Sequence, residues 1–331
     1  MLEGGEFKTL RPDERCVLWL ELLCGQVCIV QGEIEAARQL LTDGFATSQQ
    51  TFGTGDVLTI EFQTALAEVY IERREIKLAI SYLNIELAFS YIEFELAGAE
   101  IGKRDICEIT ALTLAAKVFC ISGLFNDANS LFLECLKQAR SIVGDNHSIV
   151  LRILYVKIEI ELRQEDYATA EKLLRGLRNV ITIDHGPEHL EVLQITLQLA
   201  YVKLRMGESG EAGQICQALL VQQQERHTDT HDLITLTKAV LWLSDLHSGK
   251  TDSEGDLEND LLKSLENESR PNPKLARRWE TVALLAEEFG AVDVANALKK
   301  HCDKAMELAF GVEYLQAMEK KRVSPEDSNN E

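Results

Sequence analysis

The segment Phe62-Gln63-Thr64-Ala65-Leu66-Ala67-Glu68-Val69-Tyr70, followed by Arg74 and Ala79, decides the fold of this chain. Large apolar residues recur in it at spacings of three and four, which is the period of an amphipathic helix. Ala67 is a small residue at a place where a neighbouring helix has to come close, and Ala79 gives a second such place twelve residues later. The segment therefore predicts a helix, a turn near Arg74 and a second helix packed closely on the first.

The same arrangement recurs along the chain. Anchor alanines follow one another at spacings of 42, 49, 42, 42 and 83 residues: Ala37, Ala79, Ala128, Ala170, Ala212 and Ala295. Twelve positions before the anchors, most residues are small: Gly25, Ala67, Ala116, Ile158, Ala200, Trp242 and Ala283. Five positions before the anchors, most residues are glycine: Gly32, Arg74, Gly123, Glu165, Gly207, Gly249 and Gly290. The gap of 83 is about two periods and predicts a degenerate copy centred near Glu254. Glycine suits the end of the first helix because a positive φ costs it little. The period predicts stacked helical hairpins that share one core.

A second signature lies between the units. Gly144-Asp145-Asn146-His147, Gly186-Pro187-Glu188-His189 and Thr228-Asp229-Thr230-His231 place a histidine before a helix at intervals of 42 residues. Asp and Asn in such segments are helix N-cap residues. The alanine and glycine spacings resemble the tetratricopeptide repeat (TPR), and the 42-residue period with its Gly-x-x-His linker is similar to the kinesin-light-chain subtype. This resemblance implies an all-α, right-handed superhelical α-solenoid of about seven TPR-like hairpins.

The repeat positions also divide the chain. Residues 1–14 are expected to be an N-terminal extension, residues 15–317 the solenoid and residues 318–331 a disordered tail. The expected units are 15–56, 57–105, 106–147, 148–189, 190–231, a degenerate 232–273, and 274–317. We expect the second helix of unit two to run from Ile76 to Ala97. In unit six we expect an acidic loop with a shortened helix, with a hinge between two subarrays as the alternative.

The composition narrows the function classes. The chain has 331 residues, 54 acidic against 34 basic, and a formal net charge of −20. Such a charge repels nucleic-acid phosphates and anionic membranes, so neither is an expected partner. No basic n-region precedes an apolar segment, and no stretch has about 18 uncharged apolar residues, so we expect a cytoplasmic protein. The sequence leaves the oligomeric state open.

Metal and cofactor sites are not expected. The eight cysteines lie in apolar, helix-like segments, which predicts reduced thiols buried in the core. Cys16, Cys24 and Cys28 could face a metal, but no second cluster completes a tetrahedral set. The pairs His185 with His189 and His227 with His231 recur at the repeat period between units, which favours helix capping over metal binding.

An enzyme is a remote alternative. Residues 126–134 resemble the magnesium-binding NSE motif of class I terpene cyclases. Ala128 is a repeat anchor, however, and neither an aspartate-rich partner motif nor a basic rim for diphosphate is present. No P-loop, GxSxG, HExxH or Rossmann motif appears either. The sequence therefore predicts a non-enzymatic protein.

The resemblance implies a concave surface lined by the first helix of each hairpin. Its candidate partner-binding residues, taken unit by unit, are Glu61, Glu68 and Glu72 in unit two, Lys117 in unit three, Arg152, Tyr155 and Arg163 in unit four, and Tyr201 and Arg205 in unit five, with Thr64, Thr110, Thr113, Glu159 and Gln194 beside them. We expect the arginines and tyrosines to form a basic and aromatic patch, and the unit-two glutamates an acidic one. The predicted function is a scaffold or adaptor that binds a partner peptide or helix. The alternative is a regulatory array that responds to a ligand or peptide.

Overall fold

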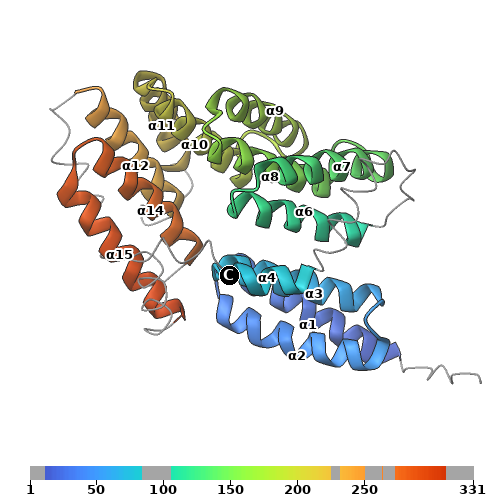
Figure 1. Ribbon diagram of the computed structural model, residues 1–331. Coiled ribbons are helices and arrows are strands. Elements are labelled where there is room, and N and C mark those ends of the chain that lie inside the picture. Colours follow the sequence, from blue (N-terminus) through green and yellow to red (C-terminus); the bar gives the residue numbers. More distant parts are fainter. Residues whose placement is uncertain (1–11, 84–105, 225–231, 250–262, 264–272, 311–331) are drawn as a thin grey trace, which may run out of the picture. The chain divides into compact units, whose positions relative to one another are not determined.

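The computed structural model describes residues 12–83, 106–224, 232–249, 263 and 273–310, and these residues are helical with short turns (Figure 1). The described part contains no strand. Its helices are α1 (Pro12–Gln31), α2 (Ile34–Phe52), α3 (Val57–Glu72), α4 (Ile76–Leu83), α6 (Ile106–Ile121), α7 (Phe125–Val143), α8 (Ser148–Arg163), α9 (Tyr167–His185), α10 (Leu190–Arg205), α11 (Ser209–Gln224), α12 (Asp232–His247), α14 (Pro273–Glu288) and α15 (Val292–Phe310). The prediction of an all-α chain of helical hairpins is confirmed.

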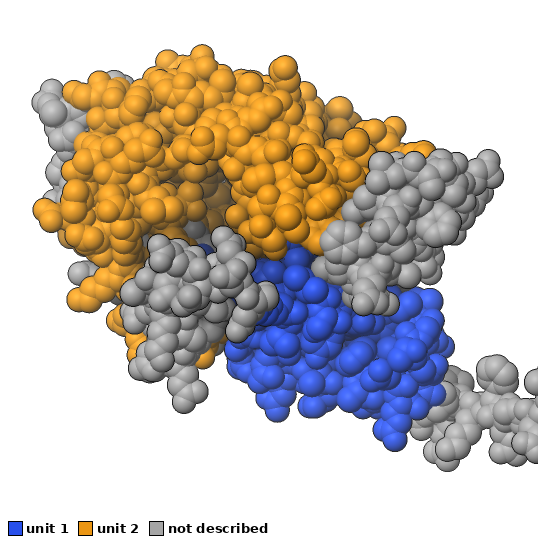
Figure 2. Space-filling model, viewed as in Figure 1, with its two compact units in different colours: residues 1–118 blue, residues 119–331 orange. Residues whose placement is uncertain are grey.

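The chain forms two compact units, residues 1–118 and 119–331, and the boundary lies in the last turn of α6 (Figure 2). Within the units, α1 packs on α2, α3 on α4, α8 on α9, α10 on α11 and α14 on α15. By their place in the sequence repeat we call α1, α3, α6, α8, α10, α12 and α14 the A helices, and α2, α4, α7, α9, α11 and α15 the B helices. The seven-unit division of the sequence stays a prediction. Residues 84–105, 250–262, 264–272 and 311–331 lie outside the described residues, and with them most of the predicted long helix of unit two, the unit-six loop and the tail.

The anchor alanines lie where helices cross. All six are at most 1% exposed, and the residues twelve positions earlier are buried as well. At Gly25 in α1, a Cβ atom would lie 2.5 Å from Leu41 Cδ2 of α2, so only glycine fits this crossing without a shift. The small residues of the repeat therefore set the distance between paired helices.

The turn between A and B helices has one conformation throughout the described part. Arg74 and Glu165 replace the expected glycine, yet their φ angles are 57° and 61°, close to the 80° of Gly207. The next amide closes the turn in each case: Glu75 N–H donates to Tyr70 O at 2.9 Å, and Asp166 N–H donates to Glu161 O at 3.0 Å. The two departures in sequence therefore keep the left-handed turn at a conformational cost.

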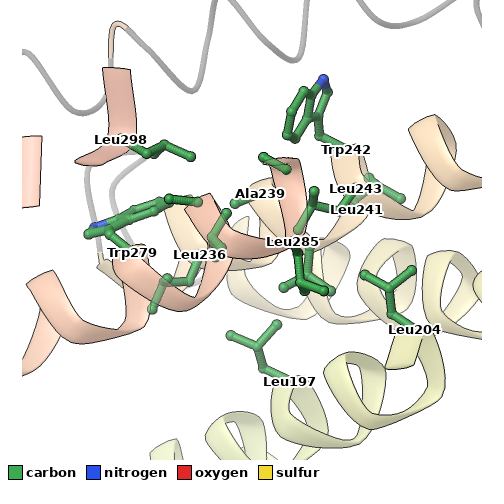
Figure 3. Close-up of a cluster of buried hydrophobic side chains, with 14 of the residues drawn as sticks. Leu197, Leu204, Leu236, Ala239, Leu241, Trp242, Leu243, Trp279, Leu285 and Leu298 are labelled. Carbon is green, nitrogen blue, oxygen red and sulfur yellow. The ribbon is translucent and has the colours of Figure 1, made fainter. Parts of the chain in front are cut away.

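A core of the second unit lies among α10, α11, α12, α14 and α15 (Figure 3). Trp242 and Trp279 are its largest members, at 2% and 1% exposed. Trp242 occupies the repeat position at which five other units have glycine or alanine and unit four has Ile158. Residues 250–262 and 264–272, which follow α12 in the chain, lie outside the described residues.

The cysteine prediction is wrong at the N-terminus. Cys120, Cys135, Cys216 and Cys302 are buried, but Cys16 and Cys24 are exposed and Cys28 is only half-buried. These three residues lie on α1, which has no earlier helical pair in the described structure to cover it. Burial raises the pKa of the Cys216 thiol to about 12, which keeps it protonated.

Candidate partner-binding site

The predicted partner-binding residues occupy four positions of the repeat. Counting back from the anchor alanine, Glu72, Arg163 and Arg205 stand at position −7, and Glu68, Lys117 and Tyr201 at position −11. Tyr155 stands at −15, and Glu61 and Arg152 at −18. These spacings of three, four and four place the positions on one face of each A helix.

Arg205 is at the centre of the best-defined cluster. Its Nε donates a hydrogen bond to Tyr167 Oη at 3.0 Å, and its guanidinium carbon lies 5.3 Å from the centroid of the Tyr167 ring. Its Nη1 donates to Glu288 Oε2 at 3.1 Å. Tyr201 lies one turn earlier on α10, and burial raises the pKa of its phenol. An arginine held by an aromatic ring and a carboxylate is suited to recognising a carboxylate or peptide group.

The Arg205–Glu288 ion pair shows how the A helices of the second unit are arranged. Arg205 is seven residues before Ala212, and Glu288 is seven residues before Ala295, so both occupy position −7. They belong to α10 and α14, and α12 packs against both helices. Packed helices lie about 8–10 Å apart, so two helices separated by a third would be roughly 16–20 Å apart in a flat layer. Their direct contact across α12 favours a concave A-helix side in this unit.

Tyr155 links two A helices of the same unit. Its hydroxyl, on α8, donates to Glu191 Oε1 on α10 at 2.9 Å. Burial, and after it the hydrogen bond to Glu191, raises the pKa of the phenol well above its ordinary value. Tyr155 is therefore a neutral hydrogen-bond donor at physiological pH.

The two remaining arginines are exposed on α8. Arg163 Nε lies 3.4 Å from Glu159 Oε1, a pair spaced i, i+4 whose side chains are 44% and 34% exposed. Arg152, three turns earlier, is exposed as well. Arg163, Arg205 and Tyr155 are thus each in contact with a carboxylate of the same chain. The patch is mixed in charge, which corrects the expectation of a basic surface.

The acidic candidates of the first unit differ from what the sequence predicts. Glu72 is only 6% exposed, and its Oε1 lies 3.8 Å from Lys117 Nζ on α6. Two predicted partner-binding residues therefore lie next to each other as a helix-to-helix ion pair, and Glu72 is not an open carboxylate. Glu61 and Glu68 are half-buried on α3, while Thr113 is buried and donates to Ile109 O.

The sequence pattern did not indicate Tyr167, Glu288 or the ion cluster of Lys203 with three glutamates. Position −7 of unit seven would have indicated Glu288, because Arg205 holds the same position in unit five. Lys203, only 7% exposed, lies 3.1 Å from Glu171 Oε1 and 3.2 Å from Glu211 Oε2 and bonds Glu208. The hydrogen bond with Glu208 is the main cause that raises the pKa of Lys203. Because its partners Glu171 and Glu211 lie on α9 and α11, Lys203 links these two helices to α10.

The histidines lie at helix boundaries. His147 is the N-cap of α8, and its Nδ1 accepts from Ile149 N–H at 3.3 Å. His189 is the N-cap of α10 but makes no capping bond with its side chain. Its ring stacks on His185, with 4.7 Å between centroids. His227 and His231 lie outside the described residues.

Residues 126–134, which resemble the magnesium-binding NSE motif, make contacts of another kind. Asn129 Oδ1 accepts from Lys157 Nζ at 2.6 Å, and that ammonium lies 5.5 Å from the centroid of the Phe132 ring. A lysine at the motif is unfavourable for a cation. Throughout the described residues, no group of three or more His, Cys, Asp or Glu side chains is placed to hold a metal ion. None of the described helices is long and apolar enough to span a membrane.

Comparison with solved structures places this arrangement in a known fold class. A Rap protein complexed with competence and sporulation factor is similar with a TM-score of 0.62 at 14% identity, over 88% of this chain and 75% of that one. The Rap conjugation gene regulator of plasmid pLS20, in complex with the Phr* peptide, gives 0.60 at 14% identity, over 97% and 80%. The TPR-like repeats of a Podosopora anserina protein described as a kinesin light chain give 0.53 at 13% identity, over 65% and 99%.

No protein-family model matches the sequence, and comparison with curated proteins finds no match. At these identities the likeness concerns the fold alone. The chain thus has the fold of TPR-like helical-repeat proteins, as the alanine and glycine spacings predict.

Proposed function

We propose that the protein is a non-enzymatic interaction module that binds an extended peptide or a partner helix on the A-helix face of its second unit. The observation that carries this proposal is the contact of Arg205 with Glu288. It joins a half-buried arginine on α10 to an exposed carboxylate on α14, with Tyr167 of the B helix α9 bonded to the arginine and Tyr201 one turn before it on α10. Tyr and Arg are the residue types enriched at binding hot spots.

The geometry suggests how a partner is recognised. The side chain of Glu288 is 58% exposed, whereas that of Arg205 is 24% exposed and is held by Tyr167. A carboxylate of the partner can replace Glu288 at low cost, because an exposed ion pair contributes only about 0–1 kcal/mol. Arg205 would then keep its orientation while its acceptor changes. The partner segment is expected to carry an acidic residue next to apolar or aromatic ones.

The fold comparisons support this class of function without specifying the partner. Two of the similar structures are complexes, one with competence and sporulation factor and one with the Phr* peptide. By analogy of fold, the concave side of a TPR-like array is suited to an extended segment.

A peptide-display selection followed by direct binding measurements tests the proposal. Peptides enriched on the wild-type protein would be labelled and titrated by fluorescence polarisation against Arg205→Ala and Arg175→Ala. Arg175 is the matched control, an arginine on a B helix that pairs with Glu171 at 2.7 Å. We expect Arg205→Ala to weaken binding at least tenfold and Arg175→Ala to change it less than twofold. Equal affinities for all three proteins would overturn the assignment of the site.

A regulatory array is the second candidate function, favoured by the same ion pair. A ligand that displaces Glu288 removes a direct contact between α10 and α14 and so permits the curvature of the second unit to change. Small-angle scattering of the peptide complex against the free protein distinguishes the two cases. A change in radius of gyration, reproduced by Glu288→Gln without peptide, indicates the regulatory array, whereas an unchanged radius indicates a static module.

A further inference from the structure

Helix α1 has an exposed apolar face. The α1 face comprises Val17, Leu20, Leu23, Cys24, Val27 and Val30. Its five aliphatic side chains are between 49% exposed, at Leu23, and 76% exposed, at Val30, and Cys24 is exposed as well. The opposite side of α1, with Leu18, Leu22 and Ile29, is buried against the rest of the first unit. The helix is therefore apolar on both sides but covered on only one, which is unusual for a soluble helix.

The register of the repeat shows which surface this is. Val17, Leu20 and Val27 stand 20, 17 and 10 residues before Ala37. The residues at the same positions in α3, α8 and α10 are at most 5% exposed: Thr59, Phe62 and Val69; Val150, Ile153 and Ile160; and Val192, Ile195 and Val202. The preceding B helix packs against each of these A helices. The α1 face is thus the surface on which a preceding pair of helices would stack.

An end of a helical-repeat array that faces water is normally polar. Here the sequence from Cys16 to Gln31 has one charged residue, Glu21, which is half-buried. Arg15, at the edge of the face, is engaged by Asp56, with its Nη2 at 3.0 and 3.1 Å from the two carboxylate oxygens. The α1 face is consequently almost uncharged, although the chain as a whole has a net charge of −20.

We propose that the α1 face binds the α1 face of a second copy of this chain, so that a twofold axis relates the two α1 helices. Two copies of charge −20 repel each other, and they can approach with little repulsion where the surface is neutral. The six side chains expose an area on the order of 500 Å² per copy, so a symmetric contact buries about 1,000 Å² in total. That area is at the lower limit for a specific interface, so the dimer is expected to be weak and to form only as the protein concentration is raised. An apolar contact between like-charged chains also becomes stronger as salt screens the repulsion.

Sedimentation velocity of the full chain tests the proposal. The wild type is expected to change from monomer to dimer between about 1 and 200 µM, with a lower dissociation constant in 0.5 M than in 0.05 M NaCl. Leu20→Glu with Val27→Glu is expected to remain a monomer throughout. The matched control is Ile183→Glu with Val221→Glu, two exposed apolar residues on B helices at 83% and 62%, which should dimerise like the wild type. A wild-type monomer at 200 µM, or a dimer that persists in Leu20→Glu with Val27→Glu, overturns the proposal.

The exposed thiol of Cys24 gives a second readout that needs no change to the face. We expect the rate of maleimide labelling at Cys24 to fall severalfold as the protein concentration rises through the dimer range. In Leu20→Glu with Val27→Glu the rate should not depend on concentration. A labelling rate that is constant in the wild type contradicts the proposed contact even if some other surface forms dimers. The result is independent of peptide binding, because Arg205 belongs to the other unit.

Discussion

Helices α1 and α10 have nearly the same apolar residues at the same repeat positions, and only α10 buries them. Val17, Leu20 and Val27 of α1 correspond to Val192, Ile195 and Val202 of α10, yet the first set is 52–61% exposed and the second is 0–5% exposed. The difference comes from the neighbours, because α9 precedes and covers α10, whereas no described pair precedes α1. A repeat pattern thus reports which face of a helix is apolar, but the position of the helix in the stack decides whether that face is buried.

The largest effect on the free energy of unfolding is expected at the repeat position where α1 and α10 differ most in burial. Ile195→Ala leaves a cavity at a fully buried position and should lower the free energy of unfolding by about 2–5 kcal/mol. Leu20→Ala at the equivalent position should change it by no more than about 0.5 kcal/mol, because Leu20 is mostly exposed. Urea unfolding at 1 µM, where the proposed dimer is dissociated, measures both. Similar losses for the two variants would mean that α1 is covered in solution.

The anchor alanines should not show this difference. Ala37 and Ala170 are both 0% exposed, so a leucine at either place has to be accommodated at a crossing of two helices. We expect Ala37→Leu and Ala170→Leu each to cost about 1–3 kcal/mol of unfolding free energy. Thermal and urea unfolding provide the measurement. A wild-type-like stability of Ala170→Leu would show that the repeat register is misassigned.

The smallest change in the free energy of unfolding is expected for substitutions in the turns between A and B helices. Glu165 and Gly207 occupy the same position in consecutive hairpins, with φ angles of 61° and 80°. Glu165→Gly removes the conformational cost of a left-handed non-glycine residue and should stabilise the protein by about 0.5 kcal/mol, whereas Gly207→Ala should destabilise it by about 1 kcal/mol. Glu165→Ala is the control for loss of the carboxylate and should show no gain. If Glu165→Ala stabilises as much as Glu165→Gly, charge rather than φ is the cause.

The sequence predicts the fold in detail because the repeat is a local geometric rule. Ala67, Ala79 and the glycine position at Arg74 are sufficient to place a helix, its end and the next crossing. Even a residue that departs from the rule, such as Glu165, adopts the expected turn. Local spacing specifies these features, and the same bonds close each turn.

The site is less predictable because it depends on side-chain reach and on curvature. Periodicity places Glu72 on the correct face of α3, but the lysine at position 117 makes it a buried ion pair instead of a groove carboxylate. The Arg205–Glu288 contact joins residues 83 apart in the sequence, on two helices that both pack against α12. Comparing one repeat position down all units would have identified the pair as candidates. The spacing of the A helices that brings them together is not encoded in the pattern.

The most direct test of the account compares two equal sets of charge reversals on the two helices of one pair. Arg152→Glu with Arg163→Glu alters the A helix α8, and Arg175→Glu with Arg178→Glu alters the B helix α9, so each protein has the same change in net charge. The measured quantity is the affinity of a display-selected peptide, by fluorescence polarisation, with helicity checked by circular dichroism. If the partner binds on the A-helix face, the α8 variant should bind at least tenfold more weakly and the α9 variant should change less than twofold. An unchanged affinity for the α8 variant, or a larger loss for the α9 variant, would contradict the assignment of binding to the A-helix face.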